Sequence, residues 1–133
     1  MATTKTETTV WPTLGYRDAR AAIRFLTEAL GFEEALVVPG EGDGLVAHAQ
    51  LRWPLGGGVM LSSIAAGSFL DDRHAGAASV YVVTDEPDAL FARATGAGAE
   101  VVRDLYDADY GSRGFSVKDP EGNLWSFGTY RGE

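Results

Sequence analysis

The feature that most constrains the fold of this 133-residue chain is an internal repeat. Asp18 and Asp85 are 67 positions apart, and so are Gly31 and Gly98. Each Asp is suited to cap the N-terminus of a helix, and each Gly is suited to end one in a left-handed conformation. The same order of predicted elements surrounds both pairs, so the sequence predicts two copies of one structural unit.

Hydrophobic periodicity predicts a strand, a helix and three further strands in each unit. In the first unit the helix is expected at 19–30, and the strands at 10–16, 33–38, 46–53 and 58–63. In the second unit a helix is expected between Asp85, its N-cap, and Gly98, and the strands at 78–84, 100–104, 115–118 and 124–130. The sequence therefore predicts an α+β fold of two tandem βαβββ modules. We expect them to form a curved, cup-like mixed sheet with the helices outside and a ligand-binding trough inside.

The repeat also sets the expected domain boundaries. Residues 1–8 are polar and low in complexity, so we expect a flexible tail, and residues 9–133 should form a single domain. The first module is expected at about 10–64 and the second at about 78–131. The segment 65–77 between them is rich in Gly, Ala, Asp and Ser without a clear period, and is predicted to be a linker.

Composition excludes several classes of function. The chain has 19 acidic and 11 basic residues, a net charge of -8, and such a surface repels a nucleic-acid backbone and an anionic membrane. It contains no Cys, so it forms no disulfide and offers no thiolate. No apolar run of the signal-peptide type opens the sequence. We therefore expect a cytoplasmic protein that binds neither nucleic acid nor membrane.

Six short motifs, in this order and spacing, carry a resemblance to a known family. They are Leu14–Ala19, Phe25–Phe32, His48–Arg52, Val59–Ser62, Tyr110–Arg113 and Asp119–Trp125, the last of which reads Asp-Pro-Glu-Gly-Asn-Leu-Trp. Over about residues 10–130 the chain resembles the vicinal oxygen chelate superfamily, which includes glyoxalase I, extradiol dioxygenases, fosfomycin resistance proteins and bleomycin resistance proteins. The resemblance implies paired βαβββ modules, usually in homodimers whose troughs form between modules of two chains.

The resemblance also implies where a metal would be bound. Metal-dependent members place ligands on the first and last strands of each module, and counting along this sequence puts those positions at Trp11, Met60, Ala78 and Ser126. An indole, a thioether, a methyl and a hydroxyl lack the imidazole or carboxylate that a divalent cation needs. A register shifted by one residue would instead bring in His48 or Gln50. We therefore expect no metal and no cofactor. A protein without them is closest in character to the metal-free bleomycin-resistance branch of the superfamily.

Aromatic side chains indicate what such a trough would bind. Trp11, at a ligand position, would offer a flat stacking surface, whereas Trp125, one residue from another such position, is expected in the core. Tyr106 and Tyr110 lie in a predicted loop among Asp residues, where they would suit a flat or cationic ligand. An ordinary acidic loop explains that pattern equally well. His48, on a predicted strand, is either a structural histidine or a ligand contact.

From these features we expect a homodimer that sequesters a small aromatic molecule, favoured in cationic form by the acidic loop, without transforming it. The residues expected to bind it are Trp11, His48, Met60, Ser62, Ala78, Val80, Tyr106, Tyr110, Ser126 and Gly128. No residue is expected to be catalytic, although an enzymatic role stays open. The alternative is a glyoxalase-like metal-dependent lyase or isomerase, which needs ligands that the count does not find. A third alternative is a partner-binding module with a filled trough.

Overall fold

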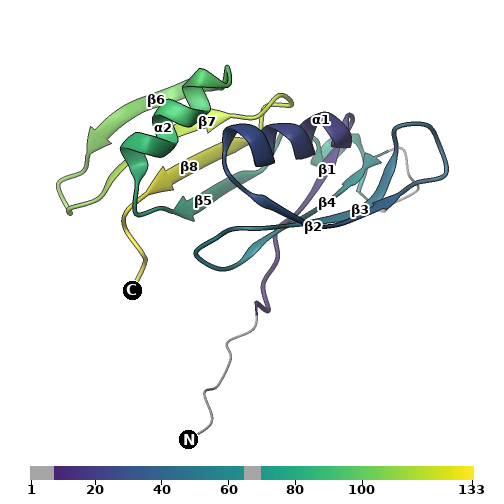
Figure 1. Ribbon diagram of the computed structural model, residues 1–133, viewed down its shortest axis with the longest axis horizontal. Coiled ribbons are helices and arrows are strands. Elements are labelled where there is room, and N and C mark those ends of the chain that lie inside the picture. The colour runs from purple at the N-terminus through teal and green to yellow at the C-terminus, as the bar shows by residue number, and fades with distance from the viewer. Residues whose placement is uncertain (1–7, 65–69) are drawn as a thin grey trace, which may run out of the picture.

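The computed structural model describes residues 8–64 and 70–133 (Figure 1). Most of the predicted tail and the first part of the predicted linker lie outside the described residues. From residue 70 onward the linker contains one short 3-10 helix, η3 (Asp72–His74). The modules on either side of this linker can therefore be compared element by element.

The first module has the predicted β-α-β-β-β order. Its first strand is β1 (Thr13–Tyr16), and Asp18 then caps α1 (Ala19–Arg24) by accepting a backbone hydrogen bond from the first turn. The helix continues as one π-helical turn, η1 (Phe25–Ala29), and ends before Gly31, whose φ of +92° suits glycine. Three strands complete the module: β2 (Glu33–Pro39), β3 (Val46–Arg52) and β4 (Gly58–Ser63).

The second module repeats this order, with strand ends that differ from the prediction by up to three residues. Its elements are β5 (Ser79–Val83), α2 (Pro87–Gly96), β6 (Glu100–Asp107), β7 (Arg113–Lys118) and β8 (Leu124–Gly128). The N-cap of α2 is Glu86 rather than Asp85, and its side chain makes no capping hydrogen bond. Strand β6 runs three residues beyond the predicted 100–104, so Tyr106 lies on a strand rather than in a loop.

The strands form two sheets of four, in the orders β1-β4-β3-β2 and β5-β8-β7-β6. In each sheet the first and last strands of the module are parallel, and the other neighbours are antiparallel. This confirms the α+β fold of two tandem βαβββ modules. Figure 1 shows α1 and α2 along one side of the molecule, each over its own sheet. Neither these helices nor any other in the described ranges is long and apolar enough to span a lipid bilayer.

The hydrophobic core lies between helices and sheets and runs through both modules. Trp125 is fully buried, as predicted, and its ring contacts Phe32 of the first module edge to face. Trp53, just after β3, packs against Phe32 and against Phe127 of the second module. Its indole Nε1 also donates a hydrogen bond to the carbonyl oxygen of Val83 at 2.7 Å. Aromatic contacts therefore join the two modules into one core.

A buried carboxylate makes a second connection between the modules. Asp119, in the turn between β7 and β8, is only 5% exposed. Its Oδ2 accepts hydrogen bonds from the hydroxyl of Tyr16 at 2.6 Å, from Asn123 Nδ2 at 3.0 Å and from Trp125 Nε1 at 3.1 Å. Its Oδ1 accepts from the backbone N–H groups of Glu121 and Asn123. We call these five residues the Asp119 cluster.

Two further observations show what the Asp119 cluster does. The carboxylate of Glu121 accepts hydrogen bonds from the backbone N–H groups of Arg17 and Asp18, directly ahead of α1. Burial, with the charge of Asp119 beside it, raises the pKa of Tyr16 well above its ordinary value, so the phenol stays a hydrogen-bond donor. The closing Asp-Pro-Glu-Gly-Asn-Leu-Trp motif is therefore a connection between the modules.

Candidate ligand-binding site

The helix-free face of the second sheet contains a pocket of about 420 Å³, here named the concave pocket. All four strands of the sheet contribute residues to it. Four residues predicted for the site line it: Tyr106, Tyr110, Ser126 and Gly128. Its volume is typical of sites for small molecules.

Small residues on β7 and β8 form the floor of the concave pocket. Gly114 and Gly128 lie opposite each other on these strands, and a β-carbon on Gly114 would lie 2.1 Å from the carbonyl oxygen of Phe127. The next pair on this face is Ser116 and Ser126, whose hydroxyl oxygens are 2.8 Å apart and share one hydrogen bond. The close approach of the β8 backbone therefore requires glycine at position 114, and the floor carries hydroxyl groups.

Tyrosines and one guanidinium group form the walls of the concave pocket. Tyr81, on β5, is 50% exposed and donates a hydrogen bond from its hydroxyl to the carbonyl oxygen of Tyr130 at 2.7 Å. Partial burial raises the pKa of Tyr81 above its ordinary value of 10.0, so its phenol stays protonated at neutral pH. Tyr110 packs edge-on against Tyr130. Arg103 covers the ring of Tyr106, with Cζ 3.5 Å from the ring centroid.

The helix-free face of the first sheet carries three other predicted residues. Met60 on β4 lies opposite Gln50 on β3, and His48 follows on the same face of β3. The Nε2 atoms of Gln50 and His48 are 2.9 Å apart, so the amide and the imidazole share a hydrogen bond. The ring of Trp11 lies close against Gly58 of β4. These side chains present an indole, a thioether and an imidazole.

The two ends of this face differ in exposure. Toward β1, Ser62 is only 6% exposed, and its neighbour Gly15 lies against Leu70. Ser62 was predicted to bind a ligand, but it is buried in this structure. On β2, Leu36 and Val38 share the face with the β3 residues opposite them and are 43% and 40% exposed. One end of the face is therefore closed, and the other is a bare apolar surface.

The structure changes the register predicted for the first strand of the second module. In the parallel pair of β5 and β8, Tyr81 lies opposite Ser126, and Val80 lies opposite Trp125. Residues opposite each other share a face, so Tyr81 shares the pocket face with Ser126, while Ala78 and Val80 pack toward the core with Trp125. The prediction that Ala78 and Val80 lie on the floor of the trough is therefore wrong. Val80 instead lines a separate cavity between the modules.

The π-helical turn explains this error of one residue. The two helix N-caps, Asp18 and Glu86, are 68 positions apart, whereas the glycines that end the helices are 67 apart. In η1 the backbone hydrogen bond from the N–H of Leu30 to the carbonyl of Phe25 spans five residues instead of four. The first helix therefore contains one extra residue, and a count back from Asp85 reaches the wrong face of β5.

The corrected register allows the metal-ligand positions implied by the family to be tested. Trp11 lies two residues before the β1 residue that faces Met60, and Ser79 lies two residues before the β5 residue that faces Ser126. Ser79, not Ala78, is thus the equivalent of Trp11. An indole, a thioether and two hydroxyls do not fit a divalent cation, which needs imidazole or carboxylate ligands. Within 8–64 and 70–133, no three His, Cys, Asp or Glu side chains gather closely enough to hold one.

The carboxylates that were expected to favour a cationic ligand do not line the concave pocket. Asp107 accepts a hydrogen bond from Arg113 at 3.0 Å, and the same guanidinium binds Asp88 at 2.7 Å. Asp104 accepts from the backbone N–H of Leu105. In the described part of the chain, the pocket lining contains one charged side chain, and it is cationic.

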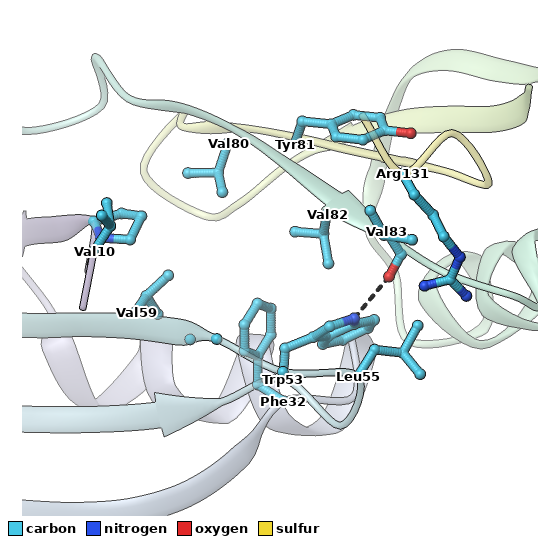
Figure 2. A pocket seen from close by; sticks show the side chains of 14 residues that line it. Val10, Phe32, Trp53, Leu55, Val59, Val80, Tyr81, Val82, Val83 and Arg131 are labelled. Carbon is cyan, nitrogen blue, oxygen red and sulfur yellow. Dashed lines mark hydrogen bonds between the residues drawn. The ribbon is translucent and has the colours of Figure 1, made fainter. Parts of the chain in front are cut away.

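A second cavity, of about 360 Å³, lies between the two modules (Figure 2). Figure 2 shows Trp53 and Phe32 on one side of it and strand β5 on the other, joined by the hydrogen bond from Trp53 to Val83. At its edge Arg131 is paired with Asp85. The residues that line this cavity also form the contact between the modules. The indole N–H of Trp53 and the guanidinium of Arg131 already have partners there. The concave pocket is therefore the better candidate site.

Nine of the thirteen described residues that line the concave pocket were not predicted, and three of them carry its polar chemistry: Tyr81, Arg103 and Ser116. Tyr81 follows from alternation once the register of β5 is correct. Arg103 and Ser116 lie opposite each other on β6 and β7, beside a β-bulge between Val101 and Arg103 that no residue pattern announces. A periodicity argument could therefore have found Tyr81 but not Arg103.

The comparisons with known proteins agree with this fold. Residues 8–127 match the family model described as Glyoxalase/Bleomycin resistance protein/Dioxygenase superfamily, so the chain belongs to that superfamily. It is similar to an uncharacterized protein of Mycobacterium bovis, with 37% identity over 123 residues, 88% of this chain and 80% of that protein. An uncharacterized protein of Mycobacterium tuberculosis has the same identity over 88% of this chain and 71% of its own length.

Solved structures show the same arrangement of elements. TioX from Micromonospora sp. ML1 matches with a TM-score of 0.74 and 31% identity, over 90% of this chain and 98% of that chain. A glyoxalase/bleomycin resistance protein from Streptomyces sp. CB03234 matches with a TM-score of 0.65 and 20% identity, over 86% and 94% of the two chains. The second likeness concerns the fold alone.

Proposed function

We propose that this protein is a cytoplasmic ligand-binding member of its superfamily, which sequesters a small planar aromatic molecule of the antibiotic type without transforming it. The observation that carries the proposal is the composition of the concave pocket. Its volume of about 420 Å³ has room for a flat ring, and its tyrosines offer faces on which such a ring stacks. Affinity would come from buried apolar area and stacking, at roughly 25 cal/mol per Å² before ordering costs.

The side chains of the pocket support binding rather than turnover. A general base needs a pKa near the working pH, but burial raises the pKa of Tyr81 and keeps its phenol protonated. The other polar side chains of the described lining are the phenols of Tyr106 and Tyr110, serine hydroxyls and the guanidinium of Arg103. None of them is an imidazole or a carboxylate, the side chains that most often act as general bases.

We propose that the protein acts as a homodimer. Leu36 and Val38 expose large apolar side chains on the helix-free face of the first sheet, next to His48 and Met60. A second copy that covered this face with its concave pocket would bury that surface and enclose a ligand between the two sheets. Sedimentation velocity should then give a dimer, and Leu36→Lys should shift it toward monomer. A wild-type monomer at all accessible concentrations would contradict this part of the proposal.

Isothermal titration calorimetry with 2-naphthamide tests the binding function. The wild type should bind this neutral bicyclic probe saturably, and the probe should be recovered unchanged. Tyr106→Ala should weaken binding about tenfold through the loss of stacking. Leu55→Ala, in the cavity between the modules, is the matched control and should bind as the wild type does. Loss of binding in Leu55→Ala alone would move the site to that cavity, and no binding by the wild type would overturn the proposal.

The alternative function is a glyoxalase-like metal-dependent lyase or isomerase. It requires a cation held by several side chains, and the four implied positions supply an indole, a thioether and two hydroxyls. Elemental analysis of protein purified without chelator separates the two functions. A stoichiometric divalent metal that is lost in a Met60→Ala variant, together with turnover of a thiol adduct, would establish the alternative.

A further inference from the structure

The guanidinium of Arg103 is positioned but lacks an anionic partner. Its Cζ lies 3.5 Å from the centroid of the Tyr106 ring, and both side chains line the concave pocket. Across residues 8–64 and 70–133, no carboxylate forms an ion pair with it. Stacking on an aromatic face holds the plane of a guanidinium while its N–H groups at the edge remain available. The guanidinium of Arg103 is therefore fixed in orientation by Tyr106, and its N–H groups can donate hydrogen bonds to an anionic ligand in the pocket.

The floor of the pocket also has a hydrogen-bond donor to spare. The hydroxyls of Ser116 and Ser126 are 2.8 Å apart, so one of them donates to the other. Each hydroxyl has one O–H, and the second O–H is left for another acceptor. This donor and the guanidinium lie on the same face, because Ser116 is opposite Arg103 on the neighbouring strand. The polar groups of the pocket are thus suited to a ligand that accepts hydrogen bonds.

Two acidic side chains of β6 are engaged elsewhere. Asp107 is held by Arg113 and Asp104 by backbone, and no Asp or Glu among the described residues lines the pocket. The net charge of -8 therefore acts on a ligand only at long range, where salt screens it. Inside the pocket the local charge is that of Arg103.

We propose that the concave pocket selects planar aromatic ligands that carry an anionic group, such as an aromatic carboxylate. The ring stacks against the tyrosine walls, the carboxylate accepts hydrogen bonds from the guanidinium of Arg103, and a serine hydroxyl of the floor donates to a further acceptor. This rests on the proposed binding function and reverses the charge that the sequence led us to expect for the ligand.

Three probes that share one ring system test the selection: 2-naphthoate, 2-naphthamide and 2-naphthylmethylammonium. In calorimetry with the wild type, 2-naphthoate should bind about tenfold more tightly than the amide, and the ammonium compound most weakly. Arg103→Gln should weaken binding of 2-naphthoate much more than binding of the amide, and so remove the preference for 2-naphthoate. Arg73→Gln, which removes the same charge from an exposed residue of η3, is the matched control and should keep the preference.

The outcomes separate this inference from the function on which it rests. Equal affinities for the three probes, or a preference that survives Arg103→Gln, would overturn the anionic selection and leave the binding function standing. Tightest binding of the ammonium compound would also overturn it and restore a cationic ligand. Failure of all three probes to bind would overturn both proposals. Both arginines are exposed, so circular dichroism should show that their variants stay folded.

Discussion

The two modules share one topology, yet the two contacts that join them differ in chemistry. Just after β3, Trp53 of the first module packs on Phe127 of β8 and donates to the carbonyl of Val83 at the end of β5. In the turn after β7, Asp119 of the second module reaches the end of β1 and accepts from the hydroxyl of Tyr16. Corresponding hairpins thus make corresponding contacts, one aromatic and the other polar.

The two contacts should differ in how much stability is lost when a side chain is removed. An aromatic contact is a sum of many weak attractions, so truncating the ring loses them in proportion to the area removed. A buried carboxylate that accepts five hydrogen bonds leaves several buried donors unsatisfied when it is removed. The polar connection should therefore be the more sensitive of the two.

The largest expected effect is that of Asp119→Ala. Removing the carboxylate leaves the buried donors of Tyr16, Asn123 and Trp125 without their acceptor, so the free energy of unfolding should fall by about 4 kcal/mol. Urea denaturation measures this change. Asp43→Ala, at an exposed turn, is the matched control and should stay within about 0.5 kcal/mol of the wild type. A loss under 1 kcal/mol in Asp119→Ala would break the comparison.

Trp53→Ala should have the next largest effect. The indole is half-buried and loses its contacts with Phe32 and Phe127, so we expect a loss of about 2 to 3 kcal/mol in the free energy of unfolding. Trp53→Phe keeps most of the ring and loses the hydrogen bond to Val83, so it should cost about 1 kcal/mol. If the two variants were equally destabilised, the hydrogen bond rather than the packing would carry this connection.

Tyr16→Phe tests the polar connection through its pH dependence. At neutral pH the variant should lose about 1.5 kcal/mol, the typical value of a hydrogen bond to a charged acceptor. Because folding raises the pKa of Tyr16 above its ordinary value of 10.0, its stabilising effect is complete below pH 10 and declines as the pH rises further. The difference in unfolding free energy between wild type and Tyr16→Phe should therefore shrink between pH 9 and 11. A constant difference would show that the Tyr16 phenol does not couple to folding.

The sequence predicted the elements of both modules because each has its own local signal. Asp18 caps the first helix as expected, and Trp125 is in the core on the face that alternation assigned to it. The relation between the modules was harder, because a single π-helical turn shifts the repeat by one residue and exchanges the faces of β5. That is why Val80 was placed in the trough instead of Tyr81.

The partners of the Asp119 cluster could not be predicted for a different reason. Tyr16 and Asp119 are 103 residues apart, and no periodicity connects them. The turn that contains Asp119 was recognised as a family motif, but a motif does not state what its carboxylate binds. The concave pocket was only partly predicted because Arg103 lies beside a β-bulge, where the register depends on the folded sheet.

The smallest predicted effect compares the starts of the two helices. The side chain of Asp18 accepts a hydrogen bond from the backbone N–H of Ala21 at 3.0 Å, whereas Glu86 makes no such bond to α2. Asp18→Ala should therefore lower the free energy of unfolding by about 1 kcal/mol, and Glu86→Ala should change it by less than about 0.3 kcal/mol. Glu86→Ser introduces a shorter side chain that reaches the first-turn N–H groups, so it should stabilise the protein by about 0.5 kcal/mol. Thermal denaturation of the three variants measures the order of their stabilities. If Glu86→Ala lost as much free energy of unfolding as Asp18→Ala, the two helix N-termini would be energetically equivalent despite their different hydrogen bonds.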